Sequence, residues 1–253
     1  FVEALVVFIG VKFSVGNIPE QIYKLKNIDM EKSHKEKGDT GFNVTRNTVL
    51  SFYWPLMITG FMKTLITPII NTGLARTVNP EIALSAYAVA FSFGIILYSP
   101  TFMFHQVSIN FIDNKNYNFE EVKRFGIYIG VFCTFLIGLV AFSGIGEYIL
   151  NNWIGASNEI TLLALDVLKI MMLLPFISVA REFYWGILMK RRKTQYVGKG
   201  KFINILCVVI GILIMSFINP TNPAILGISG FIIGQLMESV YLFIIAHKAK
   251  VII

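Results

Sequence analysis

Residues 202–247 read "FINILCVVIGILIMSFINPTNPAILGISGFIIGQLMESVYLFIIAH" and contain two long apolar runs. The first run covers 202–218 and the second 224–247, and each is close to the ~20 residues that cross the hydrocarbon core of a bilayer. The linker between them, "NPTNPA", is rich in asparagine and proline, which end helices. This stretch predicts two membrane-spanning helices joined by a tight turn.

The same pattern recurs along most of the chain. Hydrophobic residues make up 55% of the 253 residues and charged residues 15%, whereas soluble domains carry about 25% charge. Mean hydropathy is +0.66. We predict one partial span at 1–16 and six full spans near 47–74, 80–111, 125–146, 161–189, 202–218 and 224–247. Because lipid requires every backbone group to be satisfied within its own segment, and alternating strands are absent, the sequence predicts an all-α integral membrane bundle of six helices preceded by one partial helix.

Basic residues are distributed unevenly among the connections. Segment 17–46, loop 113–124, loop 190–201 and the tail after His247 hold 17 lysines and arginines together, whereas the alternate connections hold only Arg76. This asymmetry is the positive-inside signal, so we expect those four segments, including the C-terminus, to be cytoplasmic. Topology and anionic lipid then account for the net charge of +7 without a nucleic-acid partner.

The beginning of the chain resembles its last span. Residues 2–9, "VEALVVFI", align without gaps to 237–244, "MESVYLFI", and pair Glu3 with Glu238. If this is a true repeat, 1–16 is the last helix of a truncated N-terminal half, 17–46 is a basic cytoplasmic linker and 47–253 is a six-helix transmembrane half. A fragment and a half-size protein that dimerises both fit this pattern.

Four stretches resemble a known family: "FYWPLMITGF" at 52–61, "NTGLAR" at 71–76, "GEYILNNWIG" at 146–155 and "WGILMKRRKTQYVG" at 185–198. In their order and spacing they are similar to the multidrug/oligosaccharidyl-lipid/polysaccharide (MOP) exporter superfamily, and within it most similar to the progressive ankylosis proteins and their prokaryotic relatives. The resemblance covers roughly residues 48–250. It implies one half of a 12-helix, MATE-like fold, with a missing N-terminal half or a second copy of the chain as partner.

Ionisable and amide side chains inside the predicted spans are the candidates for function, because polar groups at bilayer depth are rare. We assign seven residues to a candidate substrate or ion cavity: Lys63, His105, Arg181, Glu182, Asn204, Gln235 and Glu238. A structural ion pair between helices is an alternative for Arg181, Glu182 and Glu238. A packing histidine is the alternative for His105, and hydrogen bonding between helices for Asn204 and Gln235.

Other features are interpreted more simply. Asp166 and Lys169 lie near a span end, where we expect a solvated interfacial role. The "GKGK" at 198–201 lacks the spacing of a phosphate loop and is interpreted as a basic loop. "GEYILNNWIG" is expected to lie along the outer interface, either as a short helix or turn or as a polar-capped loop.

Prolines and glycines mark flexible or closely packed positions. Pro55, Pro68 and Pro175 fall inside spans and are candidate hinges, because proline removes a backbone hydrogen bond. The resemblance implies that the first helix of each half bends during transport. Gly126-xxx-Gly130 and Gly230-xxx-Gly234 are expected to allow close helix packing. Cys133 and Cys207 are expected to be small apolar residues without a disulfide.

Serine-hydrolase, zinc-protease and phosphate-loop motifs are absent from the sequence, so we expect neither an enzyme nor a cofactor. The interpretation is an exporter or flippase in the plasma (cytoplasmic) membrane. It would move an amphipathic organic anion, a drug or a lipid-linked substrate by alternating access between two pseudo-symmetric bundles. A proton or sodium ion remains possible as coupling ion, and an antiporter is included in this interpretation. The alternative is a non-transporting membrane assembly or signalling subunit.

Overall fold

The structure is a computed structural model that describes residues 46–112, 118–191, 193–218 and 220–248. From Val49 onward the chain forms one compact unit, distinct from the unit that ends at Thr48. The predictions for 1–16, and those for 17–46 apart from Arg46, lie outside the described residues. The same is true of the proposed repeat between Glu3 and Glu238.

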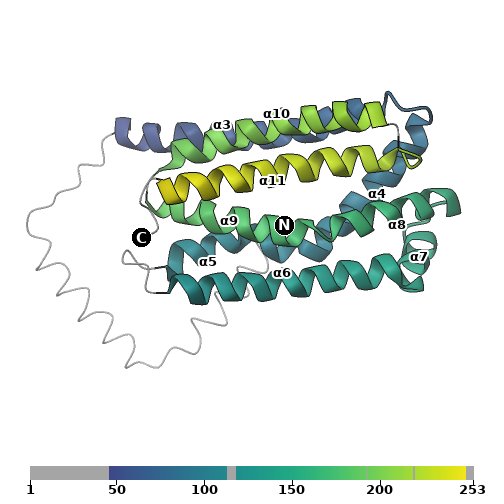
Figure 1. The fold of residues 1–253 in the computed structure, drawn as a ribbon, viewed down its shortest axis with the longest axis horizontal. Helices are drawn as coiled ribbons and strands as arrows, with labels where there is room; N and C mark the ends of the chain where they lie inside the picture. Colours follow the sequence, from purple (N-terminus) through teal and green to yellow (C-terminus); the bar gives the residue numbers. More distant parts are fainter. Residues whose placement is uncertain (1–45, 113–117, 192, 219, 249–253) are drawn as a thin grey trace, which may run out of the picture. The chain divides into compact units, whose positions relative to one another are not determined.

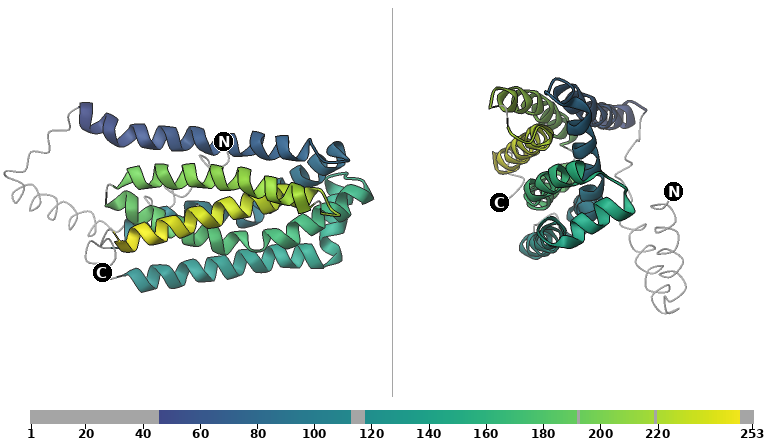
Figure 2. Two further views of the ribbon diagram at one scale, coloured as in Figure 1. Left: turned by 45° about the horizontal axis from the view of Figure 1, so that its top comes forward. Right: turned by 90° about the vertical axis from the view of Figure 1, so that its right-hand side faces the viewer.

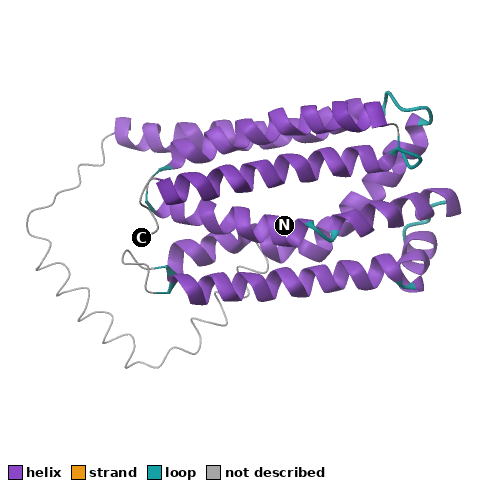
Figure 3. Cartoon of the chain, viewed as in Figure 1, coloured by secondary structure: helices purple, strands orange, loops and turns teal. Residues whose placement is uncertain are grey.

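The described residues form helices joined by short connections, and no strand occurs among them (Figures 1 and 3). Their bounds are α3 (Arg46–Leu74), α4 (Pro80–Tyr98), η1 (Ser99–Met103), α5 (Phe104–Phe111), α6 (Phe119–Phe142), α7 (Gly144–Tyr148), η2 (Ile149–Trp153), α8 (Asn158–Met171), α9 (Leu174–Lys190), α10 (Thr194–Ile218) and α11 (Ala224–Lys248). The all-helical fold class is confirmed for this part of the chain.

Four of these helical stretches are long and apolar enough to cross a membrane: Pro80–Phe111, α6, α10 and α11. A fifth span arises if α8 and α9 are counted together across the 43° bend between them. The stretch predicted as a first full span, 47–74, forms α3 but does not meet the same criterion within the described chain. Lys63 and several threonines and asparagines lower the apolar character of this helix. The structure therefore supports transmembrane helices and leaves the count of six as a prediction.

Prolines and caps explain where these helices begin and break. Pro80 and Pro175 both lie in the first turn of their helices, where a missing N–H costs nothing. Ser157 caps α8 by accepting a hydrogen bond from the Ile160 N–H. The span at 80–111 is continuous in sequence, but η1 interrupts it at Pro100, where a 3-10 turn replaces the α-helix.

Element boundaries differ from the prediction at α6 and after it. The helix begins at Phe119 rather than 125, because Glu120 and Glu121 suit a helical first turn, and it ends at Phe142. The following "GEYILNNWIG" is a short helix, α7, continued by a π-helical turn, η2, so the loop alternative is wrong.

The bundle is organised around α9 and α11. Helix α9 packs against α5, α6 and α11, and α11 lies between α9 and α10 (Figures 1 and 2). The predicted glycine contact in α11 is confirmed, because a Cβ at Gly234 would lie 2.4 Å from a methyl of Val208 on α10. Both cysteines are free, with Cys133 buried as predicted and Cys207 half-buried.

Candidate functional site

A cavity of about 260 Å³ lies among α3, α5, α9, α10 and α11. Four of the seven predicted cavity residues contribute to its wall, and they come from four different helices. Its lining comprises Thr59, Gly60, Lys63, His105, Arg181, Trp185, Met189, Lys201 and Glu238. The remaining predictions, Glu182, Asn204 and Gln235, are buried partners of these lining residues.

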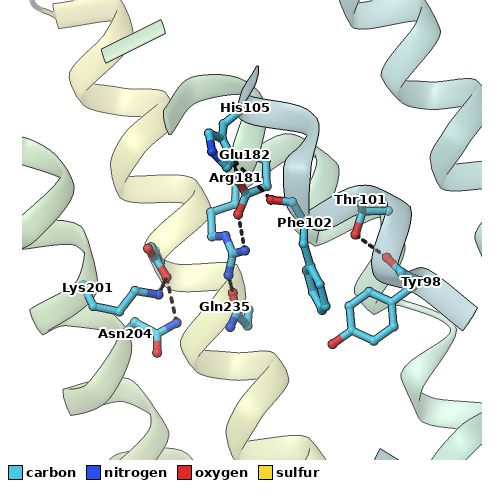
Figure 4. A network of polar contacts seen from close by, with 10 residues as sticks. Tyr98, Thr101, Phe102, His105, Arg181, Glu182, Lys201, Asn204 and Gln235 are labelled. Atoms are coloured by element: carbon cyan, nitrogen blue, oxygen red, sulfur yellow. Dashed lines mark hydrogen bonds and ion pairs between the residues drawn. The ribbon is translucent and has the colours of Figure 1, made fainter. Parts of the chain in front are cut away.

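One polar network is centred on Arg181 of α9 (Figure 4). Its guanidinium donates hydrogen bonds to the Gln235 side-chain oxygen and to the Glu182 carboxylate. The other carboxylate oxygen of Glu182 accepts a hydrogen bond from His105 Nδ1 at 2.6 Å. His105 reaches this position because η1 turns the chain just before α5, and the Thr101 hydroxyl stabilises that turn by donating to the Tyr98 carbonyl.

A second network is centred on Glu238 of α11. Lys201 Nζ donates to its carboxylate at 2.6 Å, and Asn204 Nδ2 donates to the same oxygen at 2.9 Å (Figure 4 labels the two donors). Lys201 and Glu238 are both nearly inaccessible to solvent, at 3% and 2% exposure.

Lys201 corrects the sequence interpretation of "GKGK" as a basic loop. Helix α10 begins at Thr194, so Lys201 lies two turns inside it and is buried. The signal for this residue was present in two places. Lys201 and Asn204 are three residues apart and share a helix face, and the buried Glu238 needed a partner.

The ion-pair and cavity interpretations therefore overlap without coinciding. Arg181 and Glu238 are both paired and also line the cavity, whereas Glu182 lies behind its wall. Asp166 and Lys169 form a partly exposed pair at 2.9 Å, away from this site, and their solvated interfacial role stays a prediction.

The site carries more positive than negative charge. Among the described residues, Lys63, Arg181 and Lys201 are accompanied by two carboxylates, Glu182 and Glu238. Lys63 is exposed to the cavity and forms no ion pair with any other residue of the described chain. Two opposite charges 4 Å apart attract by about 4 kcal/mol at an effective dielectric constant of ~20. The cavity therefore favours an anion.

Trp185 adds a hydrogen-bond donor that the sequence analysis missed. Its indole N–H is buried and has no hydrogen-bond partner in the part of the chain that is described. Its ring packs edge-on against the His105 ring, with centroids 5.1 Å apart. A tryptophan in an apolar helix indicates packing, so only its place in the cavity wall reveals this donor.

The cavity segment of α3, from Thr59 to Lys63, lies between two of the predicted hinges, Pro55 and Pro68. Helix α3 is continuous through both. The third, Pro175, follows directly on the 43° bend between α8 and α9. No group of three or more histidine, cysteine or acidic side chains that could hold a metal occurs among the described residues.

Comparison with known proteins supports the family that the sequence resembles. No solved structure matches the chain. The family model described as "Progressive ankylosis protein (ANKH)" matches residues 71–248, which is more than half of the sequence and contains every cavity residue outside α3. The chain therefore belongs to the progressive ankylosis protein family.

Proposed function

We propose that this protein is a membrane transporter of organic anions that works by alternating access. The observation that carries the proposal is the cavity among the helices, which has excess positive charge and, among the described residues, a lysine without an ion pair and an indole N–H without an acceptor. Lys63 lies about 16 Å along α3 from Leu74, at 1.5 Å per residue, so its ammonium is far from either helix end.

The cavity dimensions restrict what can enter. Its 260 Å³ equals roughly nine water molecules at about 30 Å³ each, which is slightly below the usual range for drug-sized ligands. A compact organic anion fits entirely, whereas only the polar head of an amphipathic or lipid-linked substrate fits. Because the site holds two carboxylates, Glu182 and Glu238, the coupling ion in this proposal is a proton or a sodium ion.

The exporter-superfamily resemblance supplies the mechanism of this proposal. In a protein with two pseudo-symmetric bundles, the described helices form one side of the pathway, and a second bundle, such as that of a second copy of the chain, forms the other. A movement of α3 then changes which side of the membrane the cavity faces. The basic segments and the C-terminus lie in the cytoplasm, and the membrane is the plasma membrane.

The test is anion transport by the full-length protein in proteoliposomes, using a panel of radiolabelled carboxylates and phosphate esters. Lys63→Ala is expected to reduce the initial rate for the transported anion at least ten-fold, because the uncompensated cation is lost. Glu238→Gln is also expected to reduce it, because Lys201 then has no counter-charge. The matched control is Lys123→Ala, an exposed lysine on α6, which leaves the rate unchanged. Unchanged transport in both Lys63→Ala and Glu238→Gln would overturn the site assignment.

The dense pairing of Arg181, Glu182, Lys201 and Glu238 favours one alternative, a non-transporting assembly or signalling subunit. In such a protein buried ion pairs specify helix packing, and no water reaches the centre of the bundle. Solvent access to position 63 separates the two functions.

A further inference from the structure

A second cavity, of about 250 Å³, lies along the seam between α3 and α10 and shares no residue with the first. The two helices run in the same direction (Figures 1 and 2). Their register is set at Gly73, where an added Cβ would lie 2.5 Å from a methyl of Ile212. This close approach makes the seam the floor of a groove.

The groove is apolar at one end and polar at the other. Ile69 and Val209 line the end deeper in the bundle, whereas Arg76 and Ser216 line the end where both helices terminate. Each wall covers seven residue steps, or about 10 Å at 1.5 Å per residue. This gradient of polarity along the membrane depth matches an amphiphile with its head at the bundle end.

Arg76 is well placed to hold an anionic head. It is the only basic residue in the connections at this end of the bundle, and it forms no ion pair with another described residue. The Arg76 side chain is not needed as a hydrogen-bond donor to the last carbonyls of α3, because the backbone N–H groups of Arg76 and Thr77 already donate to the carbonyls of Gly73 and Leu74. A guanidinium presents paired donors that match the oxygens of a phosphate.

We propose that this groove is a binding site for a membrane phospholipid. The phosphodiester binds Arg76, with the Ser216 hydroxyl beside it, and one acyl chain lies against Ile69, Val209 and Leu213 toward the bilayer centre. A free phosphate ion would leave the apolar walls uncovered, whereas an acyl chain packs against them. The lipid site does not depend on the transport function.

The test is photo-crosslinking of the full-length protein in vesicles of phosphatidylcholine and phosphatidylglycerol at 3:1. A trace of phosphatidylglycerol carries a diazirine on its acyl chain, and adducts are mapped by peptide mass spectrometry. Adducts are expected to concentrate in 69–76 and 209–216. Arg76→Gln is expected to reduce this yield at least three-fold with other adducts unchanged, and Arg76→Lys to retain part of it.

Two further variants distinguish the loss of the lipid site from a folding defect. Leu213→Trp places a bulky ring at a half-exposed groove position and is expected to lower the same adducts with Arg76 intact. Arg124→Gln, an exposed arginine at the opposite end of the bundle, is the matched control and leaves them unchanged. Adducts spread evenly over the apolar helices would overturn the proposal, as would an Arg76→Gln variant that labels normally. Displacement of the lipid by millimolar methyl phosphate, or crosslinks between copies at these residues, would also overturn it.

Discussion

At the scale of single residues, the pairing of Lys201 with Glu238 holds two charges almost entirely out of reach of solvent. Removing two charges from water is costly, and their attraction compensates only when the remaining hydrogen-bonding groups are satisfied. Asn204 meets part of this requirement by donating to the same carboxylate. The pair is therefore sensitive to the loss of either charge.

We predict that Glu238→Gln lowers the free energy of unfolding by about 3–5 kcal/mol, because it leaves the Lys201 ammonium buried without a counter-charge. Replacing both partners, as Lys201→Met with Glu238→Leu, is expected to recover most of this loss. Thermal unfolding of the detergent-solubilised protein measures both effects. Glu120→Gln breaks the exposed pair with Lys123 and is expected to change stability by less than about 1 kcal/mol. Equal effects of the two Glu→Gln changes would contradict the assignment of a buried pair.

The sequence alone could predict that most of these residues lie within the bilayer, but it could not assign their hydrogen-bonding and ion-pair partners. Lys63, Arg181 and Glu238 interrupt apolar runs, and hydropathy is sufficient to identify them. Lys201 was hidden among five other basic residues in 190–201, where the charge count favoured a loop. The Trp185 donor depends on which atoms surround its ring, and that is a property of packing rather than of composition.

At the scale of elements, the contact between α5 and α9 depends on a glycine. A Cβ at Gly186 would lie 2.6 Å from the His105 carbonyl oxygen and 2.6 Å from the Ser108 Cβ. The first of these atoms belongs to the backbone and cannot rotate away. The close approach is what brings His105 to Glu182.

We predict that Gly186→Ala forces α5 away from α9 and destabilises the protein by about 1–3 kcal/mol, the usual range for overpacking. The same displacement is expected to break the contact between His105 and Glu182. Chemical denaturation of the purified protein measures the change in stability. Gly144→Ala is the control, since no atom lies within 4 Å of its added Cβ. The tight-contact explanation fails if the two alanine variants are equally stable.

Proline positions explain where the structure breaks two of the spans that the sequence predicts as continuous. Pro175 correctly predicted a disturbance in the span at 161–189, but a proline favours the first turn of a helix, so the break falls just before it. Pro100 acts in the same way through η1 and divides 80–111. Apolar composition identifies a span, whereas the angle between its two halves depends on packing that the sequence does not show.

At the scale of the whole molecule, the described helices separate a basic end from an end with little charge. The end of α5, the start of α6, the end of α9, the start of α10 and the end of α11 lie at the first end, and the end of α3, the start of α4, the end of α10 and the start of α11 lie at the other (Figure 1). The positive-inside pattern in the sequence predicted this grouping. The position of 1–45 in this scheme remains a prediction, because these residues lie outside the described ranges.

We predict that a cysteine at position 63 reacts with a membrane-impermeant maleimide in reconstituted vesicles, because Lys63 lines a cavity large enough to hold several water molecules. The background replaces Cys133 and Cys207 with alanine. A transported anion is expected to slow the labelling, since it occupies the same space. Phe135→Cys, on the exposed apolar face of α6, is the matched control and is expected to stay unreactive from both sides. Protection of position 63 from both sides would instead favour the non-transporting subunit.

The two prolines that flank the cavity segment of α3 have a mechanical consequence. Pro55 and Pro68 have no N–H to offer the carbonyls of Ser51 and Thr64, so the helix lacks one rung of its hydrogen-bond ladder on each side of Lys63. The segment between the two prolines, which carries Lys63, is thus flanked on both sides by a weaker turn of the helix. Bending α3 at either proline therefore sacrifices one hydrogen bond fewer than the same bend in an uninterrupted helix.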